Sequence, residues 1–156
     1  MNIDQMLEAV KKNVNSNPLA ATSPKEVNLK AAKEVIYAVE SAAVKMGVKV
    51  VVAVVNGGAN LVALEAMDDS YIASIRAAQD KAYTAMALKM PTHKALEESR
   101  GGSLDGLTNG NGILLLGGGE PLINGNGVVG AVGVSGGTKD EDIALAKIGA
   151  EVFRLS

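Results

Sequence analysis

The sequence predicts an α+β fold, in which one antiparallel sheet of about five strands carries packed helices. Two observations lead to this prediction. Helical and strand-type periodicities follow one another along the chain in the order α-α-β-β-α-α-β-β-β-α. Short turns rich in Asn and Gly join successive strands, and such turns connect antiparallel neighbours. The 156 residues, 47% hydrophobic and 21% charged, suit a single domain over 1–156 with its own core.

The chain begins with two predicted helices. Apolar residues over 3–14 recur at helical spacing, and we interpret 1–22 as a helical extension that precedes the main body. The second helix starts at a capping box, Ser23-Pro24-Lys25-Glu26, with proline at the first helical position. Its apolar stripe continues to Met46, after which Gly47 is placed to end it.

A strand pair and two further helices are predicted next. The run over 48–55 is apolar on both faces, which is typical of a central strand, and 60–66 returns as its partner after a glycine turn. A helix over 71–89 then follows, and a short helix beginning at Thr92 carries His93. The residues of the longer helix that we expect to point inward are Ile72, Ile75, Ala78, Ala82 and Met86.

The C-terminal part is predicted to supply three strands and the last helix. After an irregular stretch over 99–112, short apolar runs at 113–116, 121–123 and 128–134 read as strands. The final helix covers 139–154, and Thr138 with Glu141 forms a capping box at its start.

Composition excludes several classes of function. With no Cys, the chain cannot form disulfides, thiolate nucleophiles or Cys-ligated metal sites, and a single His excludes a cluster of His ligands. The net charge of −2, with only three Tyr, one Phe and no Trp, argues against nucleic-acid binding. No apolar run is long enough to span a membrane, and the N-terminus does not read as a signal peptide. We therefore expect a cytoplasmic protein.

Two glycine motifs have both a structural and a functional interpretation. Gly125-Asn-Gly-Val-Val-Gly130 has the letters of a dinucleotide loop, but a strand follows instead of the required helix, which favours a hairpin turn. At Ser135-Gly136-Gly137 a strand runs into a helix N-terminus, which is either an anion-binding turn or a plain strand-to-helix joint. No His follows Ser135, so that a Ser-His-Asp triad in the order expected for a nucleophile elbow is excluded.

Three further features are candidates for a site. His93 is the one side chain with an unperturbed pKa near neutrality, and it is either an iron ligand, since neutral imidazole ligates iron, or a surface or packing residue. Lys81 is followed by small residues, and it is either a solvated side chain or a buried amine that acts on a carboxylate or carbonyl. The glycines over 117–119 allow a close approach of the backbone, or form a turn.

Several segments, taken together in their order and spacing, resemble the GlcG/HbpS-like family, which includes the C-terminal domain of the PduO corrinoid adenosyltransferases. The resemblance covers about residues 23–153. Its segments are 51–58 (Val-Val-Ala-Val-Val-Asn-Gly-Gly), 61–64, Ser74-Ile75 through 81–85, Pro91-Thr92, 118–122 (Gly-Gly-Glu-Pro-Leu), and 127–137 with Asp142 beyond.

The resemblance implies a profilin-like fold with a five-stranded antiparallel sheet between helices, and a homo-oligomer, either a dimer or an octamer. It also implies a haem or a similar ligand near Thr92 and His93, with His93 as the metal ligand. The positions that match the family's most recognisable segments are Lys81, Gly118, Gly119, Ser135, Gly136 and Gly137.

Three functions follow as hypotheses. The first is a small-molecule-binding protein for haem or a related tetrapyrrole. The second is an enzyme or accessory subunit that acts on a small organic acid in a glycolate- or diol-type pathway, with Lys81 as the base or electrostatic clamp and the 135–138 turn as the anion site. The third is an oligomeric scaffold without a ligand.

Overall fold

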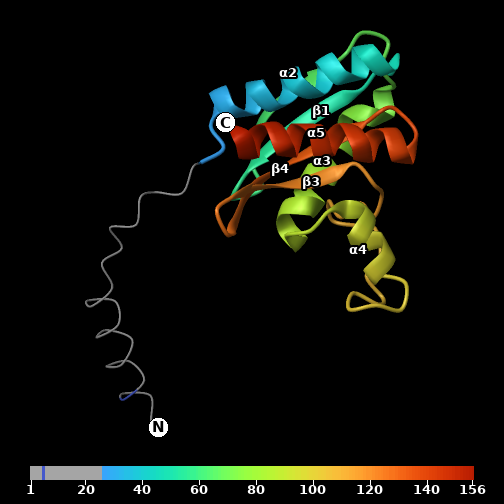
Figure 1. Ribbon diagram of the computed structural model, residues 1–156. Helices are drawn as coiled ribbons and strands as arrows, with labels where there is room; N and C mark the ends of the chain where they lie inside the picture. The colour runs from blue at the N-terminus through green and yellow to red at the C-terminus, as the bar shows by residue number, and fades with distance from the viewer. Residues whose placement is uncertain (1–4, 6–25) are drawn as a thin grey trace.

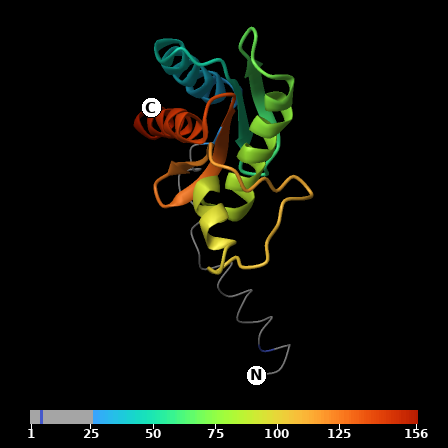
Figure 2. The ribbon, with the colours of Figure 1, turned by 90° about the vertical axis from the view of Figure 1, so that its right-hand side faces the viewer.

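A sheet of four strands lies between two layers of helices in the computed structural model, which describes residue 5 and residues 26–156. Helices α2 and α5 cover one face of the sheet, α3 covers the other, and α4 lies at one end (Figures 1 and 2). In chain order the elements are α2 (Leu29–Met46), β1 (Val51–Asn56), β2 (Leu61–Ala66), α3 (Ile72–Leu88), α4 (Thr92–Glu98), β3 (Gly119–Asn124), β4 (Gly127–Ser135) and α5 (Lys139–Leu155).

The strands pair antiparallel throughout, in the order β2-β1-β4-β3. The sheet therefore consists of two hairpins, β1-β2 and β3-β4, joined side by side through β1 and β4. Helices on both faces confirm that part of the predicted fold class. Because α2 and α5 run antiparallel, the start of α2 lies beside the end of α5 (Figure 1).

The fifth strand that we predicted over 113–116 is wrong. The backbone N–H of Leu114 donates to the Thr84 hydroxyl at 2.8 Å, and that of Leu115 donates to the Asn109 side chain at 2.8 Å. Side chains thus supply the hydrogen bonds that a neighbouring strand would have supplied. Only one isolated bridge, between Gly110 and Ile113, forms in this stretch.

Strand β1 explains why the sheet is covered on both sides. Its residues alternate between two apolar cores. Val52 and Val54 belong to the core under α2 and α5, whereas Val51, Ala53 and Val55 belong to the core under α3. The valine-rich run predicted this two-sided burial correctly.

Two predicted helix ends are confirmed, and one predicted helix start is wrong. Thr138 and Glu141 form the predicted capping box at the start of α5, and Gly47 ends α2 at a φ of 71°. Helix α2, however, begins at Leu29 after Asn28, whose side chain accepts from the N–H of Ala31 at 2.9 Å. The predicted start at Ser23 is therefore too early, and Ser23 itself lies outside the described residues. Apart from residue 5, so do the helix predicted over 3–14 and the 1–22 extension.

Helix α3 packs on the sheet through a narrow stripe of small residues. Ala78, Ala82 and Ala85 are fully buried, and Gly133 of β4 lies directly under Ala78, where an added Cβ would overlap the helix backbone. Ile72 and Ile75, which we predicted to point inward, lie off this stripe and are exposed. No helix among the described residues is long and apolar enough to cross a membrane.

Candidate functional site

Lys81 is a fully buried charged residue, with an exposed fraction of 1%. From α3 its Nζ donates to Asp142 Oδ2 of α5 at 2.8 Å and to the Val134 carbonyl oxygen of β4 at 2.9 Å. The other carboxylate oxygen, Asp142 Oδ1, accepts from the N–H of Gly137 at 2.9 Å. The pair therefore joins three elements through short, charge-assisted hydrogen bonds.

Burial acts on both members of this pair. Removal from water lowers the pKa of Lys81 and raises the pKa of Asp142, because each charged form loses its hydration. Their mutual hydrogen bond opposes both shifts. The geometry is that of a buried ion pair which stabilises the packing of α3 and α5 against β4.

The backbone at Gly118 and Gly119 runs close to this ion pair. Gly118 has a φ of 118°, and a Cβ there would lie 2.5 Å from the Val134 oxygen and 3.0 Å from Lys81 Nζ. A Cβ on Gly119 would overlap the Lys81 backbone and the Thr92 side chain. The sequence predicted either a close approach to a ligand or a turn, and the groups that this backbone approaches in the structure are the protein's own.

Thr92 supports the same segment from α4. Its hydroxyl accepts from the N–H of Gly119 at 2.9 Å, and the residue is fully buried. The structure thus turns Thr92 inward, where it fixes the first residue of β3.

The next residue along β3, Glu120, lies opposite His93. The two atoms that face each other are His93 Nδ1 and Glu120 Oε1, 3.8 Å apart, which is too long for a hydrogen bond. Within the described part of the chain, both atoms are buried and neither has a hydrogen-bond partner. Such atoms are rare in folded proteins, and each calls for a physical explanation.

The electrostatics of this second pair differ from those of the first. Burial raises the pKa of Glu120 to about 7, although Lys147 opposes the rise. Burial and the nearby Lys147 lower the pKa of His93, with Glu97 opposing and Lys94 and Lys139 adding smaller lowering effects. Because the Glu120 side chain is 10% exposed and the His93 side chain 25%, the imidazole is the more accessible partner.

Glu120 also lines an open cavity of about 500 Å³ between β3, β4 and α5. The cavity has apolar walls, with three cationic side chains and a second acidic residue around them. The apolar residues are Pro91, Pro121, Ile123, Val128 and Ala150, the cations are Lys89, Lys147 and Arg154, and the acid is Glu151.

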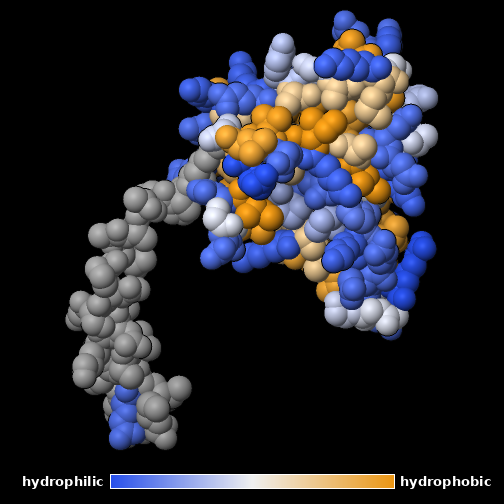
Figure 3. Space-filling view, in the orientation of Figure 1, coloured by the Kyte–Doolittle hydropathy of each residue, from blue (hydrophilic) through white to orange (hydrophobic). Residues whose placement is uncertain are grey.

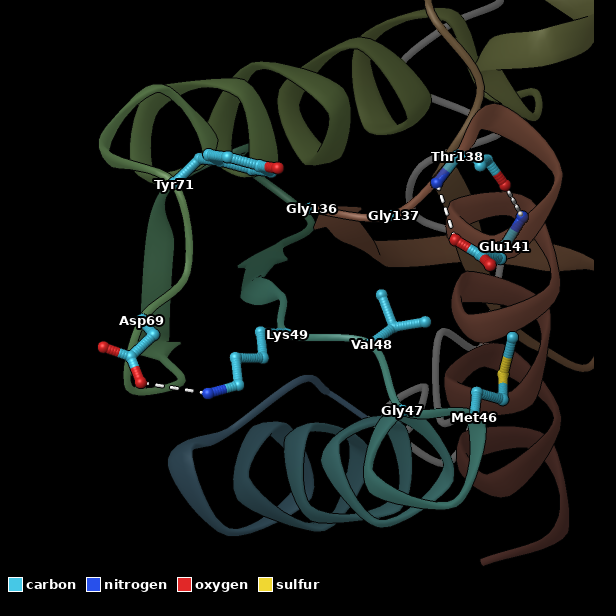
Figure 4. Close-up of a pocket in the computed structure, with 10 residues that line it drawn as sticks. All are labelled: Met46, Gly47, Val48, Lys49, Asp69, Tyr71, Gly136, Gly137, Thr138 and Glu141. Carbon is cyan, nitrogen blue, oxygen red and sulfur yellow. Dashed lines mark hydrogen bonds and ion pairs between the residues drawn. The ribbon is translucent and has the colours of Figure 1, made fainter.

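A larger hollow of about 580 Å³ lies at the start of α5 (Figure 4). Its backbone donors are already used: the N–H of Thr138 donates to Glu141 at 2.7 Å, and that of Gly137 donates to Asp142. Lys49 on the opposite side pairs with Asp69 at 3.0 Å. The chain's own carboxylates thus occupy the helix N-terminus that the sequence suggested for an anion.

The structure brings together most of the predicted site residues. The ion pair of Lys81 has four of them as neighbours, namely Gly118, Ser135, Gly136 and Gly137. Thr92 contacts the next residue, Gly119, and His93 follows Thr92 in α4. Sequence reasoning did not assign site roles to Glu120, Asp142 and Ser74. The signal for Glu120 was available, since it is the one acid within the apolar stretch over 113–123. Among the described residues, no group of three or more His, Asp or Glu is arranged to hold a metal ion.

Comparison with known proteins gives consistent results. The family model described as "Haem degrading protein HbpS-like" matches residues 27–151. An uncharacterized 15.0 kDa protein from the dhaT-dhaS intergenic region of Citrobacter freundii is 42% identical over 130 residues, which are 81% of this chain and 92% of that protein.

Solved structures are similar over nearly the same region. Klebsiella pneumoniae protein ORFY is 37% identical with a TM-score of 0.78, covering 86% of this chain and 94% of that one. The PduOC:heme complex is 26% identical with a TM-score of 0.76, covering 82% of this chain and 95% of that one. A double mutant of Streptomyces reticuli HbpS is 30% identical with a TM-score of 0.74, covering 88% and 97%.

Proposed function

The chain belongs to the HbpS-like family, and from that premise we propose that it binds haem or a related tetrapyrrole at the face that carries His93. One similar protein was solved as a complex with haem, which supports the choice of ligand. The observation in this chain that carries the proposal is the pair of unbonded buried atoms, His93 Nδ1 and Glu120 Oε1.

The pair fits a histidine that would hold the haem iron. An imidazole that ligates a metal through one nitrogen usually donates its other N–H to a carboxylate or carbonyl, which fixes the tautomer and the orientation of the ring. His93 Nδ1 faces the Glu120 carboxyl, so a small movement would complete that hydrogen bond and leave Nε2 to ligate iron. When bound, the haem would supply an iron centre with an open coordination position.

The protonation state of His93 also suits this role. A metal ligand must be neutral imidazole, and the lowered pKa keeps His93 neutral at pH 7. The cavity beside Glu120 combines apolar walls with Lys89, Lys147 and Arg154. Such a lining matches a ligand with an apolar ring system and two carboxylates.

A haem titration followed by absorbance tests the proposal. The wild type should give a saturable Soret shift, and His93→Ala should weaken binding by at least about tenfold, since it removes the axial ligand. Arg100→Ala, at an exposed position just after the same helix, is the matched control and should bind as the wild type does. A wild type without a saturable band, or a His93→Ala variant with unchanged affinity, would contradict the proposal.

The enzymatic alternative has less support. A general base needs a free lone pair and a carboxylate clamp needs an unpaired positive charge, whereas Lys81 Nζ is ion-paired with Asp142 and donates to the Val134 carbonyl. We therefore place Lys81 among the residues that hold the fold and favour binding over catalysis on an organic acid.

A homo-oligomer, a dimer or an octamer, remains part of the proposal. Leu29, Tyr37 and Val44 are exposed along one side of α2, and apolar side chains gather over α2 and α5 in the space-filling view (Figure 3). An exposed apolar band of this kind favours self-association. Light scattering on the wild type should report more than one subunit, and Tyr37→Glu should shift the distribution towards the monomer if α2 forms the interface.

A further inference from the structure

A third cavity, of about 340 Å³, lies between the start of α3, the end of β4 and the first turn of α5. It opens beside Tyr71, which also lines the hollow of Figure 4 and whose ring points towards Gly136 in that view. We propose that this cavity binds a small neutral molecule through a carbonyl or hydroxyl oxygen. The site is separate from the His93 face and does not depend on haem.

The floor of the cavity has hydrogen-bond donors that the protein does not fully use. Lys81 Nζ carries three N–H groups, and the structure gives acceptors to two of them. Ser74 and Ser135 are buried, and their hydroxyl oxygens are 3.3 Å apart, longer than the usual 2.7–2.8 Å for such a bond. Across residues 26–156, neither hydroxyl has another side-chain partner. An incoming oxygen atom could therefore accept from this group of donors.

The walls above these donors are small and mostly apolar. Ala73, Ala77, Leu116 and Gly117 form them, with Tyr71 at the opening. Apolar walls combined with a few convergent polar groups are the usual construction of a small-molecule site. The number of available donors favours a compact ligand with one or two oxygens.

The charges around the cavity select against an anion. Asp140 and Glu141 lie on the first turn of α5 but do not line the cavity, whose charged residues are Lys81, Lys139 and Asp142. Asp142 already balances the charge of Lys81 at 2.8 Å, so a carboxylate that accepted from Lys81 Nζ would bring a second negative charge beside it. A neutral carbonyl or hydroxyl compound can accept from the same donors without that repulsion, and it therefore suits the site better than a carboxylate.

A matched pair of probes tests this preference. Acetone and acetate have the same number of heavy atoms and differ in charge, so their affinities can be compared directly by amide chemical-shift titration. Ligands this small bind with Kd values of about a millimolar at best in ordinary sites. Acetone should give saturable shifts at 73–78 and 135–137, and acetate should bind at least about fivefold more weakly.

Serine variants locate the site. Ser135→Ala and Ser74→Ala should each weaken acetone binding about three- to tenfold, since each removes one hydroxyl from the donor group. Ser41→Ala on α2, across the sheet, is the control and should leave the titration unchanged. Two positions are used so that a folding defect in one variant does not decide the result.

Three outcomes would overturn the proposal: no saturable shift with acetone up to about 100 mM, equal affinity for acetate, or unchanged affinity in both serine variants. Haem binding by Ser135→Ala should match the wild type, which separates failure of this site from failure of the His93 site.

Discussion

Two acid–base pairs, Lys81–Asp142 and His93–Glu120, join different elements of this protein in a similar way. The first pair is hydrogen-bonded, whereas the facing atoms of the second are not. In each pair, a basic residue on a helix faces an acid on another element, and the Gly118–Gly119 backbone runs beside the first pair and leads into Glu120 of the second. Lys81 and Asp142 are 2.8 Å apart, and Asp142 has a further backbone donor. His93 and Glu120 are 3.8 Å apart, and the facing atoms are unbonded within the described structure.

This difference distinguishes a structural pair from a functional one. A buried ion pair with its hydrogen bonds made holds elements together, and removal of one partner leaves an uncompensated charge. A buried pair without hydrogen bonds destabilises the free protein, and a ligand that reorients one partner relieves that penalty. The comparison leads to four predictions, which follow in order of decreasing effect on stability.

Breaking the first pair should have the largest effect. Lys81→Met leaves the Asp142 carboxylate buried beside an apolar side chain, and we expect the free energy of unfolding in urea to fall by about 3–5 kcal/mol. Lys49→Met breaks an exposed ion pair of similar length and should change the free energy of unfolding by less than about 1 kcal/mol. Equal losses in the two variants would remove the distinction between the buried pair and a surface pair.

The second pair should make stability depend on pH through Glu120. Its folded pKa of about 7 lies above the ordinary value of 4.5, so the folded state binds the proton more tightly than the unfolded chain. The stability that Glu120 contributes is therefore fully present below pH 4.5 and is lost as the pH rises through 7, by about 3 kcal/mol in all. Urea titrations between pH 4.5 and 8 measure this loss.

Glu120→Gln should abolish most of this pH dependence, since the amide does not ionise. Glu34→Gln on the exposed side of α2 is the control and should keep the wild-type profile. A Glu120→Gln variant with an unchanged profile would show that other groups cause the loss.

Substitution of Thr92, which precedes His93 and contacts Gly119, should have an intermediate effect on stability. Thr92→Val leaves the buried N–H of Gly119 without an acceptor, and we expect a loss of about 1–2 kcal/mol in unfolding free energy. Thr92→Ser keeps the hydroxyl, so it should recover at least half of that loss. If Ser and Val behave alike, the missing methyl or altered packing matters more than the hydrogen bond.

Removal of the imidazole should have the smallest effect on stability. His93 makes no hydrogen bond through Nδ1 and its side chain is 25% exposed, so that His93→Ala should change the unfolding free energy by less than about 1 kcal/mol. The same substitution should abolish the haem-dependent stabilisation that the wild type shows in a thermal melt. A large loss of stability without haem would make His93 a structural residue.

The sequence predicted the parts of the fold that local patterns specify. The Thr138–Glu141 capping box, the glycine end of α2 and the two-sided burial of β1 all depend on neighbours in the chain, and all three are confirmed. The predicted strand over 113–116 failed because its hydrogen-bond partners, Thr84 and Asn109, are side chains that a strand pattern does not consider. The prediction that Ile72 and Ile75 point inward was wrong, because small residues rather than large ones face the sheet from α3.

The candidate site was predictable to a lesser degree. Lys81, His93 and the glycine segments were identified in the sequence, but their partners come from distant parts of the chain. Asp142 lies 61 residues from Lys81, and no local pattern indicates that the two meet. For the same reason, the burial of Glu120 opposite His93 became evident only in the structure.

The position of α2 beside α5 would allow the elements to be connected in a different sequence order. Two hairpins make the sheet, and at present the connection from β2 to β3 runs through α3 and α4. Because the start of α2 lies next to the end of α5, a short linker could join Leu155 to Val27, and the exposed loop over 101–106 could then be opened. Such a circular permutant would keep both hairpins and every helix intact while connecting the hairpins across the opposite face of the sheet. The architecture therefore has two equivalent routes between its halves, of which the natural chain uses one.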